Sequence, residues 1–331
     1  MYEPFFGLRE RPFELLPNPR FLFLAGRHRE ALSNLEYGLS AARGITLLIG
    51  EAGTGKTTLV QSVLAAADRQ NLECVVLSNP TLTRPEFFEY LAAGFRLTAD
   101  AALSKTQFLF ELHTHLETRH AAGRVTALVI DEAQSLPYEL LEEVRLLSNS
   151  ETATAKLLSV VLAGQPELTD RLNETRLRQL KQRISQRCDL RPFDVKETAA
   201  YIAGRLRIAG GDPAQIFSRE AVVAVFDASR GIPRTVNVIC DNALIGGFAA
   251  QQKPVPRSIV DEVCHDFDIG RVASNLASAD AGANGNGNGN GAARPPDARI
   301  PAAEIVGAEV DGDEAMFGNF GRRKRFSFFG S

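Results

Sequence analysis

The sequence predicts an α/β domain with a parallel sheet sandwiched by helices, then a small all-helical domain, then a disordered C-terminal tail. Three observations carry this prediction. Between residues 44 and 191, short apolar runs alternate with helical patterns, which is typical of a parallel sheet covered on both faces. From 192 to 268 only helical patterns follow, and from 269 to 331 the hydrophobic periodicity is lost. Residues 1–43 precede the sheet as a strap and a helix.

Composition indicates an intracellular globular protein. The 331 residues carry a net charge of −3, which gives no overall attraction to nucleic acid. The four cysteines are scattered and form no C-x-x-C pair, which favours buried thiols in a reducing compartment over disulfides or zinc. No apolar run reaches the length of a membrane span, and the N-terminus lacks the charged-then-apolar pattern of a signal peptide. We therefore expect a cytoplasmic protein.

The first 26 residues are rich in aromatic side chains and proline. Prolines disfavour regular structure, yet so many large apolar side chains require burial. We expect an irregular strap on the body of the α/β domain. A helix with Leu32, Leu35 and Leu39 on one stripe then ends near Gly44.

A phosphate-binding loop follows the first predicted strand, Ile45 to Ile49. It fits the pattern G-x-x-x-x-G-K-[ST], and a helical pattern follows it from Thr58 to Ala67. Glycines let successive backbone N–H groups and the helix N-terminus face a triphosphate. The residues assigned to nucleotide binding are Gly50, Glu51, Ala52, Gly53, Thr54, Gly55, Lys56, Thr57 and Thr58. Lys56 is expected on the β- and γ-phosphates, and the Thr57 hydroxyl on Mg²⁺.

Two later strands end in polar residues that suit phosphoryl transfer to water. The apolar run Ala127 to Ile130 ends in Asp131 and Glu132. Asp131 is expected to orient the metal, and Glu132 to orient or deprotonate the attacking water. The run Leu157 to Ala163 should lie beside the phosphate-loop strand. Gln165 after it is either a water-positioning side chain or a turn residue before Pro166.

The histidines do not predict a metal site. On one helix, His113 and His115 point to different faces, and His113 and His120 are about 10 Å apart along the axis. One ion cannot reach all three, so a solvated helix face is the better interpretation. A basic stretch from Arg171 to Arg187 then leads into a last strand at Cys188 to Leu190.

Helix boundaries define the second domain. Asp194 and Glu197 form a capping pair, Ser218 caps the next helix, and Pro233 and Pro256 open two more. Beyond them, residues 281–296 are Gly/Asn repeats and a proline-rich run, which predict a disordered linker. The basic and aromatic end, Arg322 to Phe329, is either a solvated tail or a peripheral contact with anionic lipid at the inner membrane or with a partner.

With Gly231-Ile232-Pro233-Arg234 at a helix start, the sequence resembles an AAA+ ATPase. The resemblance implies a P-loop AAA+ base domain at 44–191, a helical lid at 192–268, ATP and Mg²⁺ as ligands, and Arg234 as the sensor 2 arginine on the γ-phosphate. It also implies a nucleotide-dependent homo-oligomer in which one subunit's arginine completes its neighbour's site. Arg183 is placed like that finger, with Arg187 as the second candidate and a basic solvated face as the alternative for both.

Further motifs narrow the resemblance to the ExeA-type general secretion pathway protein A ATPases, over residues 1–268. Relatives of this group act in pilus biogenesis and in exopolysaccharide gene clusters. Secretion members add a membrane span and a periplasmic peptidoglycan-binding domain, which this sequence lacks, so the short soluble forms are the better match. The motifs are Tyr2 to Leu8, Arg11-Pro12-Phe13, Pro17 to Phe21, His28 to Leu32, Asp131 to Gln134 and Leu162 to Leu168.

These features are compatible with three functions. The first is an ATP-driven molecular switch that assembles or remodels a secretion, pilus or exopolysaccharide/envelope complex. The alternative is a DNA-associated ATPase of the transposition target-selection type, with the basic stretch as DNA contacts. The third is a nucleotide-sensing scaffold without hydrolysis, which the intact Asp131-Glu132 pair disfavours. The basic residues of the stretch are Arg171, Arg176, Arg178, Lys181, Arg183 and Arg187.

Overall fold

The computed structural model describes residues 1–16, 18–40, 44–68, 71–78 and 81–269. All described residues lie in one compact unit. The predicted linker and the basic, aromatic terminus lie outside the described residues, apart from Ile269 at the start of the tail.

Five parallel strands form one sheet in the order β2-β3-β4-β1-β5, with the phosphate-loop strand β1 between β4 and β5. This confirms the predicted fold class and the neighbouring position of the fourth strand. The strands are β1 (Ile45–Gly50), β2 (Leu72–Leu77), β3 (Val125–Ile130), β4 (Leu158–Gly164) and β5 (Ile184–Leu190).

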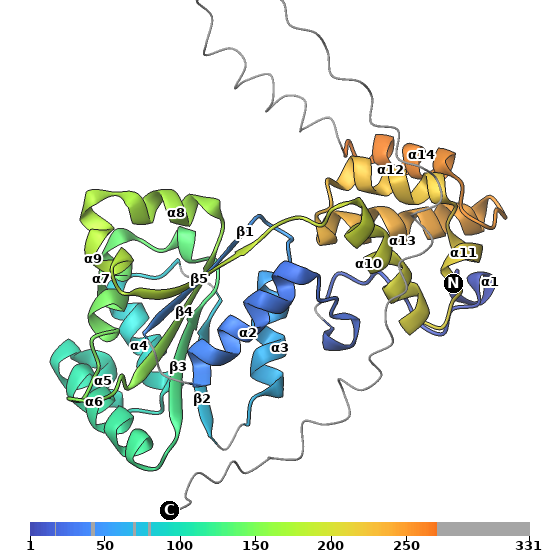
Figure 1. Ribbon diagram of the computed structural model, residues 1–331. Helices are drawn as coiled ribbons and strands as arrows, with labels where there is room; N and C mark the ends of the chain where they lie inside the picture. The colour runs from blue at the N-terminus through green and yellow to red at the C-terminus, as the bar shows by residue number, and fades with distance from the viewer. Residues whose placement is uncertain (17, 41–43, 69–70, 79–80, 270–331) are drawn as a thin grey trace, which may run out of the picture. The chain divides into compact units, whose positions relative to one another are not determined.

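Helices cover both faces of this sheet (Figure 1). Because side chains alternate along a strand, Leu47 and Ile49 pack on one side and Leu48 on the other. The Leu48 side packs against α2 (Gly26–Ser40) and α3 (Lys56–Ala66). The other side packs against α4 (Arg84–Gly94), α5 (Ala99–Leu103), α6 (Lys105–Ala121), α7 (Tyr138–Leu147), α8 (Pro166–Asn173) and α9 (Arg178–Lys181).

The last strand begins four residues earlier than predicted. β5 is an edge strand paired only with β1, and its exposure alternates along Ile184 to Leu190. Polar residues such as Gln186 and Arg187 therefore belong to the strand, because one side of an edge strand can face water. Helices α5 and α11 (Pro213–Ile216) are among those not predicted, because each is too short to show helical periodicity.

The second domain is helical, as predicted. Its helices close a core of their own, in which Leu206, Val236 and Val260 are fully buried. The helices are α10 (Val195–Ile208), α11, α12 (Arg219–Ser229), α13 (Pro233–Ala249) and α14 (Arg257–Asp266). Capping boxes or side-chain caps at Asp194 and Ser218 confirm those two predicted helix starts.

The N-terminal strap packs in this helical core, which corrects the expectation that it lies on the α/β domain. Phe6 and Phe13 are buried there, and the Phe13 ring meets Phe217 edge to face at 6.4 Å. The Arg9 N–H also donates to the Ala209 carbonyl. The aromatic side chains predicted burial correctly, but no pattern in the strap indicated which domain would supply the apolar surface. Its short elements are α1 (Glu3–Phe6) and η1 (Pro19–Phe21).

The four cysteines are free thiols, as predicted. His115 and His113 pair with carboxylates, Glu73 and Glu117 respectively, rather than with one another. Among the described residues, no group of three or more His, Cys, Asp or Glu side chains could hold a metal ion. In this same part of the chain, no helix has the length and apolar character to cross a membrane.

Candidate nucleotide site

The phosphate loop joins the end of β1 to the start of α3, as the sequence predicts. Gly53 and Gly55 have φ values of +82° and +99°, a region that other residues rarely adopt. Helix α3 begins directly after Gly55 with Lys56. The loop therefore turns the backbone so that the helix N-terminus faces the space above the sheet.

Lys56 is folded onto its own loop. Its Nζ donates to the carbonyls of Gly50 at 2.8 Å and Glu51 at 3.1 Å, and the side chain is buried. Burial lowers the pKa of Lys56, against the opposing effect of the nearby Glu132 and Asp131 charges. Its ammonium group is thus poised beside the loop, held by groups that a stronger acceptor such as a phosphate could replace.

Thr57 and Asp131 meet at the start of α3. The Thr57 hydroxyl donates to Asp131 Oδ2 at 2.6 Å, and Asp131 is nearly buried at the end of β3. A hydroxyl and a carboxylate are hard oxygen donors, and Mg²⁺ binds through one or two such groups together with phosphate oxygens and waters. This donor set fits Mg²⁺, although the two residues alone would not form a complete metal site.

Glu132 has an uncommon backbone conformation next to this pair. Its φ is +52°, and its carboxylate Oε2 accepts from Gln134 Nε2 at 2.7 Å and from Gln165 Nε2 at 3.1 Å. Burial raises the pKa of Glu132, but the two amide hydrogen bonds and the Lys56 charge outweigh burial, and the pKa is lowered overall. Glu132 is therefore an ionised acceptor beside the phosphate loop.

Arg234 comes from the start of α13 and crosses the phosphate loop. Its backbone N–H donates to the Gly53 carbonyl at 3.2 Å, and a Cβ built on Gly53 would come 2.8 Å from the Arg234 Cβ. A residue with a side chain at position 53 would thus displace the arginine. The side chain of Arg234 is exposed and lines the same cavity as the loop.

This cavity has a volume of about 390 Å³, which suits a small molecule such as a nucleotide. The loop residues from Ala52 to Thr58 and Glu132 line it, whereas Gly50 and Glu51 line a second cavity of about 410 Å³ together with Arg187. Gln165 contacts Glu132 from outside the first cavity.

Sequence reasoning missed one side of the cavity. His28 and Arg205 line it, and both are buried. The His28 ring donates through Nε2 to the Thr54 carbonyl at 3.1 Å, and Arg205 donates to the Tyr201 hydroxyl and the Pro12 carbonyl. Strap residues also line it, including Phe21 and Phe23. Only the aromatic composition of the strap could have indicated this role.

Neither candidate finger arginine belongs to this cavity. Arg183 precedes β5 at the end where Ile184 pairs with Ile45, whereas Gly50 pairs with Leu190 at the other end. The strand separates these ends by about 20 Å, farther than an arginine side chain extends. Arg187 lies within β5, and its Nη2 donates to Oδ1 of Asp189, two residues on, at 2.9 Å.

Comparisons with known proteins agree with this geometry. Residues 40–172 match the AAA domain family. The chain is 43% identical over 250 residues to general secretion pathway protein A of Aeromonas hydrophila. That alignment covers 75% of this chain and 45% of the relative, so the chain spans less than half the length of that protein.

Solved structures show the same fold at low identity. The Aeropyrum pernix ORC2 protein, in ADPNP and ADP complexes, is 15% identical with a TM-score of 0.57, covering 77% of this chain and 71% of that one. Drosophila ORC bound to DNA is 22% identical with a TM-score of 0.58, covering 81% and 67%. A Walker-type ATPase of Pyrococcus abyssi is 17% identical with a TM-score of 0.55, covering 82% and 80%.

Proposed function

We propose that this chain, an AAA protein of the general secretion pathway protein A type, binds ATP with Mg²⁺, hydrolyses it and uses the cycle as a molecular switch in assembling a secretion or envelope complex. The observation that carries the proposal is the convergence of Lys56, Thr57, Asp131 and Glu132. Three of these surround the space in front of the phosphate loop, and Thr57 binds the fourth. A scaffold that only senses nucleotide would not need the carboxylate of Glu132 there.

Each residue has a distinct part in the proposed reaction. Lys56 leaves the Gly50 carbonyl and binds the β- and γ-phosphates, since a charged acceptor forms the stronger hydrogen bond. Thr57 and Asp131 would hold Mg²⁺, which supplies positive charge to the phosphate oxygens when bound. Glu132 orients the attacking water and accepts its proton, with Gln165 steadying the carboxylate. Arg234 reaches the γ-phosphate from the lid.

A second subunit completes the site in this proposal. The position of Arg183, at the far end of β5 from its own phosphate loop, favours action on a neighbour over action within the chain. Transition-state charge on the γ-phosphate calls for an additional cation, which a finger in trans provides. We therefore propose a nucleotide-dependent homo-oligomer with Arg183 at the subunit boundary, and Arg187 as the second candidate.

The proposed role in secretion or envelope assembly rests on the similarity to a relative and not on the geometry of the nucleotide site. The relative's name, general secretion pathway protein A, supports an envelope or secretion complex as the partner, approached from the cytoplasmic side of the inner membrane. The basic, aromatic segment from Arg322 to Phe329 is the proposed peripheral membrane contact.

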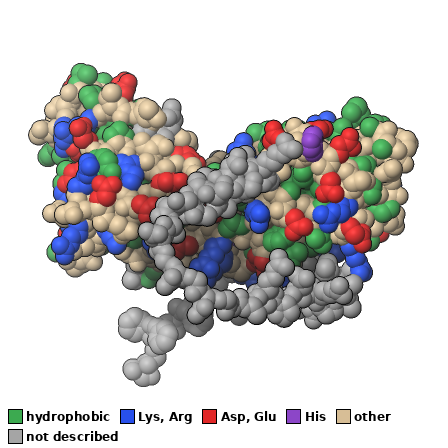
Figure 2. Space-filling model, turned by 90° about the horizontal axis from the view of Figure 1, so that it is seen from above, with side chains coloured by type: hydrophobic (Ala, Val, Ile, Leu, Met, Phe, Trp, Pro, Cys, Tyr) green, Lys and Arg blue, Asp and Glu red, His purple; other side chains and the backbone are tan. Residues whose placement is uncertain are grey.

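The local chemistry does not favour DNA as the main partner. Where the grey atoms of Figure 2 leave the surface visible, basic and acidic side chains are interspersed. Several basic side chains of the stretch already have partners within the chain: Arg171 with Gln134, Arg176 with Glu174, Lys181 with Asn173 and Arg187 with Asp189.

Phosphate release by the full chain with Mg²⁺ and ATP tests this proposal, with and without duplex DNA across a salt series. We expect hydrolysis that DNA changes little and that salt affects weakly. Steep, salt-sensitive stimulation by DNA would replace the proposed role with the DNA-associated one, because phosphate contacts release counterions. Failure to hydrolyse ATP at any protein concentration would contradict the proposal.

A further inference from the structure

We propose that Gln134 is a positioning residue for Glu132: its side-chain amide fixes one carboxylate oxygen and leaves the other to bind the attacking water. The inference rests on the proposed hydrolysis of ATP and names the group that sets its geometry. Gln134 does not line the nucleotide cavity, so it would act through Glu132 rather than on the substrate.

Both ends of the Gln134 amide are occupied. Its Nε2 donates to Glu132 Oε2 at 2.7 Å, and its Oε1 accepts from the backbone N–H of Gln165 at 3.0 Å. Gln165 Nε2 donates to the same Glu132 oxygen at 3.1 Å. The three residues thus form a closed ring of hydrogen bonds, and the ring leaves Gln134 a single orientation of its amide.

The backbone around Gln134 is anchored as well. Arg171 donates to the Gln134 carbonyl, and its guanidinium carbon lies 4.3 Å from the centroid of the Tyr138 ring. Gln134 lies in the short helix η2 (Ala133–Ser135), whose first residue, Ala133, is fully buried. The side chain therefore extends from a fixed position.

Gly164 has no side chain, and its Cα therefore leaves room for the side chain of Gln134. A Cβ at this last residue of β4 would come 3.1 Å from Gln134 Oε1 and 2.7 Å from the Leu168 side chain. A side chain at position 164 would therefore move the amide of Gln134. The end of β4 thus leaves room for the Gln134 side chain at the carboxyl end of the sheet, where Glu132 also follows β3.

Glu132 needs such support because its left-handed backbone conformation is disfavoured for a residue with a Cβ. Two amide donors on one carboxylate oxygen hold the side chain by that end. Removing the Gln134 amide should therefore loosen the carboxylate.

The test compares wild type with Gln134→Leu, which removes the amide at similar size, and with Gln134→Glu, which keeps an oxygen for the Gln165 N–H but loses the donor. Both variants should bind ATP with unchanged Kd and KM, and kcat should fall about tenfold or more. The loss should fall on kcat at unchanged KM, because Gln134 acts through Glu132 and does not line the nucleotide cavity.

Gln107→Leu is the matched control, because Gln107 donates to the Glu111 carboxylate at 2.8 Å on helix α6, away from the cavity. It should leave kcat and KM unchanged. If wild type hydrolyses ATP and both Gln134 variants keep its kcat, the positioning role is wrong while the proposed function stands. Faster turnover in Gln134→Leu, or loss of ATP binding by both variants, would equally overturn it. Absence of hydrolysis in wild type would instead remove the proposed function itself.

Discussion

The Thr57 hydroxyl donates a 2.6 Å hydrogen bond to Oδ2 of Asp131, which joins the start of α3 to the end of β3. Two segments 74 residues apart in sequence thus bring a hydroxyl and a carboxylate to one point. Two hard oxygen donors this close together in space suit Mg²⁺ that is also bound by phosphates.

Thr57→Ala should therefore raise the Mg²⁺ concentration needed for half-maximal ATP turnover about tenfold or more, because one metal ligand and its orienting hydrogen bond are lost. A Mg²⁺ titration at saturating ATP measures this. Thr118→Ala is the control, since that hydroxyl only donates to the Thr114 carbonyl within α6. Equal Mg²⁺ dependence in both variants would rule out Thr57 as a ligand.

Mixtures of two inactive variants test the finger in trans. Arg183→Ala keeps its phosphate loop but offers its neighbour no arginine, and Glu132→Gln is inactive in its own site but still presents Arg183. Each alone should turn over ATP about 10³-fold more slowly than wild type, and mixing should restore activity, because one complete site forms where they meet.

Native mass measurement of the mixture is the control for assembly. Mixed oligomers that form yet stay inactive would contradict a trans finger at Arg183. Full activity of Arg183→Ala alone would transfer the role to Arg187 or remove it.

The strap's place in the helical core predicts a large effect of Phe13→Ala. Phe13 is 1% exposed, and such truncations cost about 3–5 kcal/mol of unfolding free energy. Phe110→Ala is the matched control, because Phe110 is 69% exposed and should change stability by about 0.5 kcal/mol or less. Denaturant unfolding measures both. A similarly small loss of unfolding free energy in both variants would mean that the strap contributes little to the core of the helical domain.

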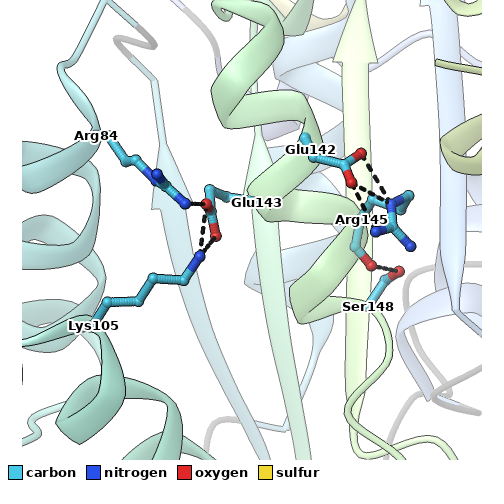
Figure 3. A network of polar contacts seen from close by, with 6 residues as sticks. All are labelled: Arg84, Lys105, Glu142, Glu143, Arg145 and Ser148. Carbon is cyan, nitrogen blue, oxygen red and sulfur yellow. Dashed lines mark hydrogen bonds and ion pairs between the residues drawn. The ribbon is translucent and has the colours of Figure 1, made fainter. Parts of the chain in front are cut away.

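A buried carboxylate links three helices of the α/β domain (Figure 3). Glu143 on α7 is 3% exposed at its side chain and binds Arg84 at the start of α4 and Lys105 at the start of α6. Both cations are partly exposed and can be rehydrated. Glu143→Gln should therefore lower the free energy of unfolding by about 2 kcal/mol, which is less than the loss expected when a fully buried ion pair is broken.

Glu142→Gln is the neighbouring control in the same helix. Its carboxylate is about half exposed and pairs with Arg145, three residues on. Losing this pair should lower the free energy of unfolding by about 0.5 kcal/mol. The difference between the two variants, measured by unfolding, should persist in high salt because Glu143 is buried. Equal costs would contradict a stabilising role of Glu143.

Much of the site could be predicted because its signals are local. The phosphate loop is one continuous motif, and Asp131 and Glu132 follow an apolar run, so their meeting at one sheet edge follows from parallel strands. Gln165 was predicted beside the site for the same reason, and the structure brings it to Glu132.

Other features depend on contacts between distant segments. The buried position of Arg205 depends on Pro12 and Tyr201, and no spacing in the sequence links the strap to α10. Gln134 was part of a recognised motif, but its contact with Glu132 requires the left-handed turn at Glu132. The start of β5 was misplaced because an edge strand tolerates polar residues that hide its pattern.

In the proposed reaction, Glu132 serves hydrolysis and not binding. The most direct measurement is ATP binding and single-turnover hydrolysis by Glu132→Gln, with Lys56→Ala as the variant expected to lose binding. Glu132→Gln should bind ATP as wild type does and retain it unhydrolysed over many wild-type turnover times, because only the acceptor for the water proton is lost. Hydrolysis by Glu132→Gln at the wild-type rate would contradict the account.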